Sequence, residues 1–143
     1  GGCLLAAALV CCLMWGVFEE CVIYSQHRMV FGRSVASYPL SLAKLARMGA
    51  LITACKAFTT HVAGLMDQGL GQMEASLVKL FSCRAAEWVT REGVQLHGGM
   101  GYAEEVAVSR YFADARVLSI FEGAEETLAI RVVGKSLVDQ ARN

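Results

Sequence analysis

Apolar residues recur at spacings of three and four over long stretches of this chain. The clearest stretch runs from Pro39 to Asp67, and its proline is the only one among 143 residues. Spacings of three and four place apolar side chains on one face of a helix. A proline suits the first turn of a helix, where its missing N–H is not needed. The pattern therefore predicts a mostly helical protein.

Four further segments show the same periodicity, and glycine-containing breaks separate them. The five predicted helices cover about 4–31, 39–67, 73–97, 106–117 and 124–141. Short connections make consecutive helices antiparallel neighbours. The expected fold is therefore all-α, an up-down antiparallel helical bundle of four to five helices, and the length predicts one domain over residues 1–143.

Composition excludes several kinds of protein. The chain is 55% hydrophobic, which favours a compact core over disorder. Thirteen basic and thirteen acidic residues give no net charge, and no basic block indicates nucleic-acid binding. The six cysteines show no CxxC pattern and no spacing typical of metal ligands. They are expected to be buried free thiols in a reducing compartment.

The segment Gly1–Phe18 is apolar and uncharged, close to the length of a transmembrane helix. No basic region precedes it and no small-residue cleavage site follows it. Glu19 and Glu20 end the apolar run. We therefore expect a helix buried on most sides within an assembly rather than a membrane span. A membrane-anchored helical protein is the alternative interpretation.

The run from Ser119 to Glu126 holds the strongest candidate for chemistry. Glu122 lies between Phe121 and Gly123, where the last predicted helix begins. An apolar pocket would raise the pKa of this carboxyl group toward that of a general base, whereas the helix N-terminus would lower it. Gly123 leaves room for a substrate to approach. The alternative is an acid that only caps the helix.

Two other segments offer candidate binding groups. The turn Gly98–Gly101 lets backbone amides approach a phosphate closely, or it simply ends a helix. Arg28 is suited to clamp a phosphate and Phe31 to pack on a ring, unless this is a solvated helix end. His97 has no neighbouring acid or nucleophile in the sequence that would make it a catalytic acid or base, which indicates a structural role.

These candidates belong to four motifs that follow one another along the chain. The order is Arg28-x-x-Phe31-Gly32, Gln95-x-x-Gly98-Gly99-x-Gly101-Tyr102, Asp114-Ala115-Arg116 and Ile120-Phe121-Glu122-Gly123. The set resembles the C-terminal helical domain of the flavin-dependent acyl-CoA dehydrogenases, over about residues 21–130. Each motif is modest by itself, but their order and spacing together are specific.

The resemblance implies an activity and a set of site residues. Members of this family oxidise an acyl-CoA thioester to the trans-2-enoyl-CoA. A glutamate removes the α-proton while the β-hydride passes to N5 of FAD. Glu122 matches that glutamate, and Phe121 and Gly123 match positions beside the substrate. The positions that match cofactor contacts, often to the FAD of a neighbouring subunit, are Arg28, Phe31, Gln95, Gly98, Gly99, Ala124 and Glu126. Ala124 stands where the family usually has threonine.

The resemblance also implies partners and a larger protein. Family members usually pass electrons to electron-transferring flavoprotein and form dimers or tetramers, in the mitochondrial matrix or the bacterial cytoplasm. They also have an N-terminal helical domain and a middle β domain, and neither is in this sequence. We therefore expect an isolated C-terminal domain that is inactive by itself. The alternative is a non-catalytic helical assembly module or a partner subunit of a dehydrogenase complex.

Overall fold

The structure is a computed structural model that describes residues 2–103, 106–120 and 133–142. Four long helices dominate the described part: α1 (Gly2–His27), α2 (Pro39–Asp67), α3 (Gln72–His97) and α4 (Ala107–Ile120). A short helix, α6 (Lys135–Arg142), follows near the C-terminus. The predicted bounds of α2 and α3 agree with the structure to within one residue at each end. The last predicted helix lies partly outside the described residues.

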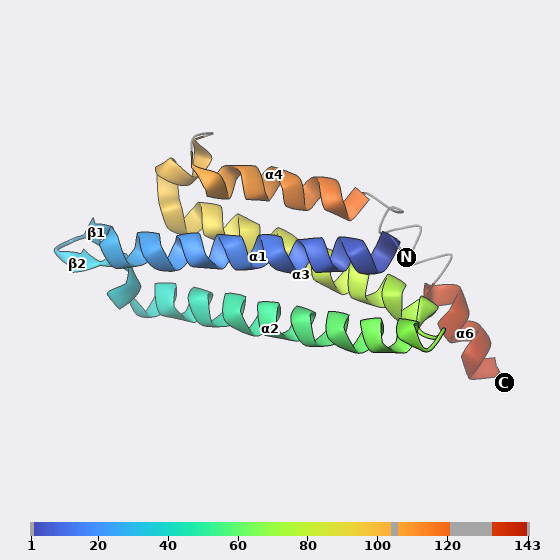
Figure 1. Ribbon diagram of the computed structural model, residues 1–143. Helices are drawn as coiled ribbons and strands as arrows, with labels where there is room; N and C mark the ends of the chain where they lie inside the picture. Colours follow the sequence, from blue (N-terminus) through green and yellow to red (C-terminus); the bar gives the residue numbers. More distant parts are fainter. Residues whose placement is uncertain (1, 104–105, 121–132, 143) are drawn as a thin grey trace.

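The long helices run side by side as an up-down bundle (Figure 1). Figure 1 shows α1 between α4 and α2, with α3 packed behind it. α3 contacts each of the other three long helices, and α1 does the same. Each of these helices therefore buries one apolar stripe against the others. The predicted all-α antiparallel bundle is confirmed.

One end of the bundle carries the two short strands and the 3-10 turns of the described residues. The strands β1 (Met29–Val30) and β2 (Arg33–Ser34) pair there as an antiparallel hairpin, and the 3-10 turn η1 (Val35–Ser37) follows. A second 3-10 turn, η2 (Gly98–Tyr102), joins α3 to α4 at the same end (Figure 1). We call this the hairpin end. The N-terminus and the last turn of α4 lie at the opposite end.

The hairpin corrects one sequence prediction. The first helix was expected to continue to about residue 31, but α1 ends at His27. The two-residue loop between the strands is Phe31-Gly32, and both residues have positive φ, 51° and 77°. Two successive positive φ values are the geometry of a type I′ turn, which matches the twist of the flanking strands. Phe-Gly is not the Asn-Gly sequence typical of this turn, so the sequence did not predict the hairpin.

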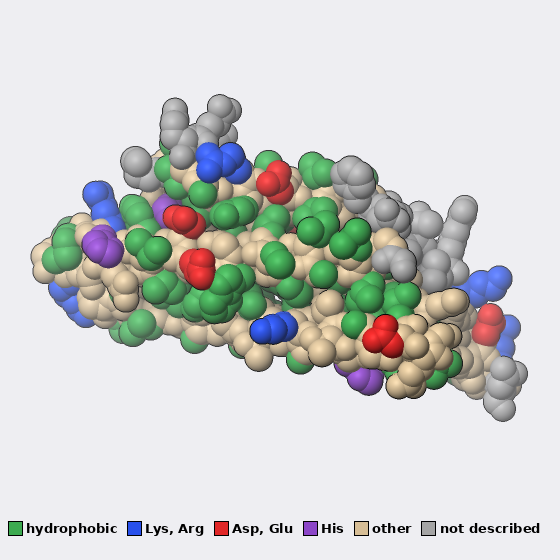
Figure 2. Space-filling view, viewed as in Figure 1, with side chains coloured by type: hydrophobic (Ala, Val, Ile, Leu, Met, Phe, Trp, Pro, Cys, Tyr) green, Lys and Arg blue, Asp and Glu red, His purple; other side chains and the backbone are tan. Residues whose placement is uncertain are grey.

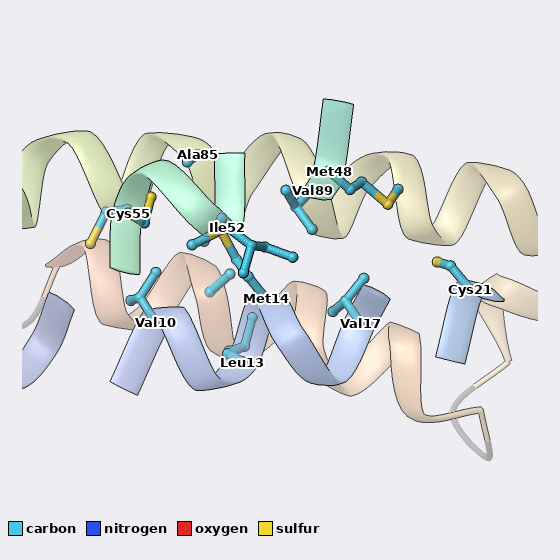
Figure 3. Packing of buried hydrophobic residues seen from close by; sticks show 13 residues of the cluster. Val10, Leu13, Met14, Val17, Cys21, Met48, Ile52, Cys55, Ala85 and Val89 are labelled. Atoms are coloured by element: carbon cyan, nitrogen blue, oxygen red, sulfur yellow. The ribbon is translucent and has the colours of Figure 1, made fainter. Parts of the chain in front are cut away.

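The core lies where α1, α2 and α3 meet. Figure 3 shows Val10, Met14 and Val17 of α1 facing Ile52 of α2 and Val89 of α3. All five side chains are buried. A second, smaller cluster lies elsewhere in the bundle and consists of Ala7, Val62, Ala75 and Val78. Apolar contact along the bundle therefore fixes the two ends relative to each other.

The opposite face of α1 remains apolar and exposed. Its large exposed side chains are Leu5, Leu9, Trp15 and Ile23. Figure 2 shows apolar side chains gathered over this part of the molecule. By length and composition α1 is the described helix that could cross a membrane, and 28% of its most apolar stretch is buried. Within this one chain α1 is thus buried on one side. Its burial on most sides within an assembly stays a prediction.

Candidate functional site

Two of the predicted motifs meet at the hairpin end. Arg28, Gly98 and Gly99 line one cavity of about 430 Å³. The other lining residues are Tyr24, Val30, Val35, Leu96 and His97. The structure therefore brings together a guanidinium group and an open glycine turn. We call this the hairpin-end cavity.

Tyr24 and His97 form the wall between the two motifs. Their rings stack with centroids 4.2 Å apart, and the Tyr24 hydroxyl donates a hydrogen bond to the His97 carbonyl at 3.2 Å. Nδ1 of His97 lies 2.8 Å from the Gly93 carbonyl. A carbonyl only accepts, so Nδ1 carries the proton. His97 is 4% exposed and fastens α3 to α1, a geometry that agrees with the structural role expected from the sequence.

The glycine turn ends α3 and leaves its backbone open. Gly98 has φ 62°, and its N–H donates to the Gln95 carbonyl, as in a helix C-cap. A Cβ atom on Gly98 or Gly99 would meet no atom within 4 Å. A Cβ atom on Gly101 would lie 2.5 Å from the Val94 carbonyl oxygen, so this position requires glycine. The absence of side chains at Gly98 and Gly99 leaves space beside the arginine for an anionic group such as a phosphate.

The hairpin holds Arg28 and Phe31 on a fixed backbone. The Arg28 N–H donates to the Tyr24 carbonyl and the Arg28 carbonyl accepts from the Val35 N–H, both at 2.8 Å. The Arg28 side chain is exposed. Phe31 is 94% exposed, and its φ of 51° is unusual for a bulky residue. An aromatic ring held in this way on a tight turn is available to pack on a molecule outside this chain.

Gln95 faces a different cavity. It is exposed and lines a space of about 420 Å³ together with Arg91, Phe112 and Ser109, and also Val94 and Gly101. Gln95 therefore does not share the hairpin-end cavity with Arg28. The sequence interpretation missed Arg91 and Phe112. Arg91 precedes Gln95 by four residues on α3, so helical spacing alone would have placed the two on one face.

The second half of the predicted site starts at the other end of the bundle. Phe121, Glu122, Gly123, Ala124 and Glu126 lie outside the described residues. The last described residue before them is Ile120, at the end of α4. α4 has 14 residues, so about 21 Å separates its two ends. Within one chain, Ile120 and the glycine turn therefore lie toward opposite ends of α4 (Figure 1).

The pKa shifts of the described residues fall on thiols of the core. Burial, with a smaller effect of the Glu20 charge, raises the pKa of Cys21 to about 12. A hydrogen bond between Cys11 and Cys55 lowers the pKa of Cys11 and raises that of Cys55. All six cysteines are free, and three of them are buried. The buried thiols of Cys21 and Cys55 thus remain protonated at neutral pH.

Comparison with known proteins identifies relatives over nearly the whole chain. A family model described as "Acyl-CoA dehydrogenase, C-terminal domain" matches residues 3–138. The mitochondrial very long-chain specific acyl-CoA dehydrogenase of Macaca fascicularis is 35% identical over 138 residues, which are 95% of this chain. The caffeyl-CoA reductase-Etf complex subunit CarC of Acetobacterium woodii is 30% identical over 123 residues, 85% of this chain.

A solved structure agrees with the fold. The crystal structure of an acyl-CoA dehydrogenase complexed with FAD from Bacillus anthracis superposes with a TM-score of 0.89 and 26% identity over 98% of this chain. The chain spans only part of these proteins: 21% of the macaque enzyme, 32% of CarC and 27% of the Bacillus anthracis chain. The matched region corresponds to one domain of the longer relatives.

Proposed function

We propose, from the premise that this chain belongs to the acyl-CoA dehydrogenase family, that it is the C-terminal helical domain of a longer FAD-dependent enzyme. The enzyme oxidises an acyl-CoA thioester to the trans-2-enoyl-CoA. The main support is the family match over residues 3–138, together with the Ile120-Phe121-Glu122-Gly123 run directly after α4. Glu122 is the proposed base, and Phe121 and Gly123 lie beside it in the sequence, as expected for residues that contact substrate.

The chemistry needs a carboxylate that is shielded from water. The thioester carbonyl acidifies the α-proton, and Glu122 takes that proton onto its carboxylate. FAD, when bound, accepts the hydride that leaves the β-carbon. The two electrons of the Cα–H bond become the new C=C bond, so the proton on Glu122 and the hydride on the flavin account for both hydrogens. Phe121 would contribute apolar surface beside the base, and Gly123 would leave space for the thioester.

The hairpin-end cavity is the proposed contact surface for FAD. The Arg28 guanidinium and the open backbone at Gly98 and Gly99 suit its pyrophosphate. The exposed ring of Phe31 suits packing against a flat group from another molecule. Gln95 is proposed to contact the same cofactor from its separate cavity. Ala124 and Glu126 would contact FAD from the run that follows Glu122.

The distance between the two halves of the site favours an oligomer. α4, a 14-residue helix about 21 Å long, separates Ile120, which precedes the Glu122 run in the sequence, from the hairpin end. Arg28 and Phe31 are therefore proposed to contact the FAD of a neighbouring copy, whereas Glu122 serves the substrate of its own chain. A homodimer or a tetramer would provide this arrangement. Electron-transferring flavoprotein is the proposed electron acceptor, because CarC is a subunit of an Etf complex.

The proposed location is the mitochondrial matrix or the bacterial cytoplasm, since the relatives include a mitochondrial and a bacterial protein.

The second candidate function is a non-catalytic assembly module. The exposed apolar side chains of α1 favour it, because they provide a large surface without any site chemistry. The two functions differ in a simple respect: only the enzyme changes its flavin spectrum with an acyl-CoA.

The decisive experiment uses the whole protein that carries this sequence. Its visible absorption is recorded before and after anaerobic addition of a panel of acyl-CoA thioesters. Bleaching of the flavin bands by one member is expected and would identify the substrate. The reverse reaction is assayed with enoyl-CoA thioesters, because one relative is a reductase. A protein without flavin, or flavin that no thioester bleaches in either direction, would favour the assembly module.

Two variants test the residues. Glu122→Gln keeps the size of the side chain and removes the base, so turnover is expected to fall by several orders of magnitude while flavin stays bound. Near-normal turnover in this variant would exclude Glu122 as the base. Arg28→Ala is expected to weaken flavin retention, because it removes the guanidinium of the hairpin-end cavity. Unchanged flavin content after dialysis would remove Arg28 from the cofactor site.

A further inference from the structure

A lysine lies fully buried beside the end of α4. Lys79 of α3 has 0% of its surface exposed, which is rare for this residue type. Its Nζ atom donates a hydrogen bond to the Ser119 carbonyl at 3.3 Å. An ammonium group is costly to bury unless acceptors surround it. The position of Lys79 therefore marks a place where a buried donor contacts the final turn of α4.

Lys79 belongs to a row of α3 residues that all contact this turn. Cys83, one helical turn further, donates weakly to the Leu118 carbonyl at 3.9 Å. Glu87, another turn on, accepts a hydrogen bond from Nη1 of Arg116 at 2.9 Å. The row follows the antiparallel course of the two helices. Three successive turns of α3 thus hold the carboxyl end of α4.

The contacts of Ser119 tie the turn together internally. Its hydroxyl donates to the Arg116 carbonyl at 2.7 Å and accepts from Nη1 of Arg116 at 2.9 Å. Ser119 itself is buried. The last four carbonyls of a helix have no partner inside the helix, and cations near this end are stabilising. Lys79 supplies both a donor and a positive group at this place, whereas the Arg116 contact is at the surface.

We propose that Lys79 is a positioning residue for Glu122. Only two residues separate Ser119 from Glu122, so the anchored end of α4 sets where the backbone of the Glu122 run begins. Removal of the Lys79 contact would free the final turn and change how the carboxylate meets the α-proton. Proton transfer depends steeply on such geometry. This inference rests on the proposed function, and it assigns Lys79 no direct contact with substrate.

The test uses the whole enzyme and the variant Lys79→Met, which keeps the length of the side chain and removes its donor. The variant is expected to retain flavin, leave KM for the acyl-CoA nearly unchanged and lower kcat about 10- to 100-fold. The deuterium isotope effect on kcat, measured with substrate labelled at the α-carbon, should rise, because proton removal becomes slower. Lys79→Gln retains an N–H donor and should fall between wild type and Lys79→Met. If Lys79→Met does not fold, Lys79→Gln alone decides.

Two controls separate positioning from a general loss of stability. Val62→Ala removes buried apolar volume in the cluster with Ala7 and should lower thermal stability without a change in the isotope effect. Lys56→Met changes an exposed lysine of α2 and should leave stability and kcat unaltered. The proposal is overturned if the Lys79 variants lose stability but keep the wild-type kcat and isotope effect. A Glu122→Gln variant that still turns over would instead refute the proposed base, whatever Lys79 does.

Discussion

The packing of Gly93 against α1 predicts the effect of one added methyl group. Gly93 of α3 is buried, and a Cβ atom there would lie 2.7 Å from Cγ1 of Val17 and 3.4 Å from Sγ of Cys21. A contact at 2.7 Å forces a neighbour to move. Val17 is fully buried, and a β-branched side chain on a helix has one strongly preferred rotamer, so it cannot simply rotate away. Gly93→Ala should therefore push α1 and α3 apart locally.

Two opposing effects set the size of the change. An extra methyl group in a well-packed core costs about 1–3 kcal/mol. Alanine in a helix gains up to about 1 kcal/mol over glycine. Gly93→Ala should therefore lower the free energy of unfolding by about 0–2 kcal/mol. Gly64→Ala is the matched control on α2, where nothing lies within 4 Å of the added Cβ, so only the helical gain of about 1 kcal/mol remains.

The assay is urea unfolding of the 143-residue chain, followed by far-ultraviolet circular dichroism. The two variants should differ by about 1–3 kcal/mol, with Gly93→Ala the less stable of the two. Val17→Ala should relieve the clash, so the double variant with Gly93→Ala should show a favourable coupling of at least about 1 kcal/mol. The packing argument is refuted if Gly93→Ala stabilises the chain as Gly64→Ala does, or if the double variant is simply additive.

Two further predictions follow from the buried thiol and from the opposite ends of α4. The pKa of Cys21 is raised from 9.0 to about 12 in the folded chain, so the unfolded chain loses the thiol proton first. The stabilisation that the protonated Cys21 thiol gives the folded chain is fully present below about pH 9 and is lost as pH rises toward 12. In urea unfolding at several pH values, Cys21→Ala should therefore reduce the fall of the free energy of unfolding with pH over this range. An equal fall in the variant and the wild type would contradict this prediction. Mixed oligomers of Glu122→Gln and Arg28→Ala protomers are formed by dissociation and reassembly. If each site takes Glu122 from one copy and Arg28 from another, a mixed pair contains one intact site and should regain turnover. Turnover no higher than that of either variant alone would argue against shared sites.

The bundle could be predicted from the sequence because its signal is repeated many times. Each long helix contains many apolar positions at helical spacing, and single exceptions such as the exposed Leu42 do not disturb the pattern. The hairpin at Phe31-Gly32 could not be predicted in this way, because it depends on four paired residues and an unusual positive φ at a phenylalanine. Local geometry of this kind has no periodicity to detect.

Candidate site residues could be proposed from the sequence, but their arrangement in space could not. The residue types at Arg28 and Gly98 indicated phosphate binding, and the structure places both in one cavity. Sequence spacing could not show that Gln95 lies in a different cavity. It also gave no reason to notice Lys79, which follows Val78 in an ordinary helical run. Its importance appears only when the buried Nζ atom is found at the end of another helix.

The helices α3 and α4 connect the two ends of the bundle at which the predicted motifs occur. η2, which holds the glycine turn, ends at Tyr102 at the hairpin end, and α4 runs from Ala107 to Ile120, the last described residue before the Glu122 run in the sequence. α3 begins near the end of α4 and ends at His97. It contacts both places, through Lys79 at one end and through His97 stacked on Tyr24 at the other. A shift of α3 along α1 would disturb both ends together. The close contact of Gly93 with Val17 opposes that shift, which makes a residue remote from the proposed chemistry a determinant of the geometry on which it depends.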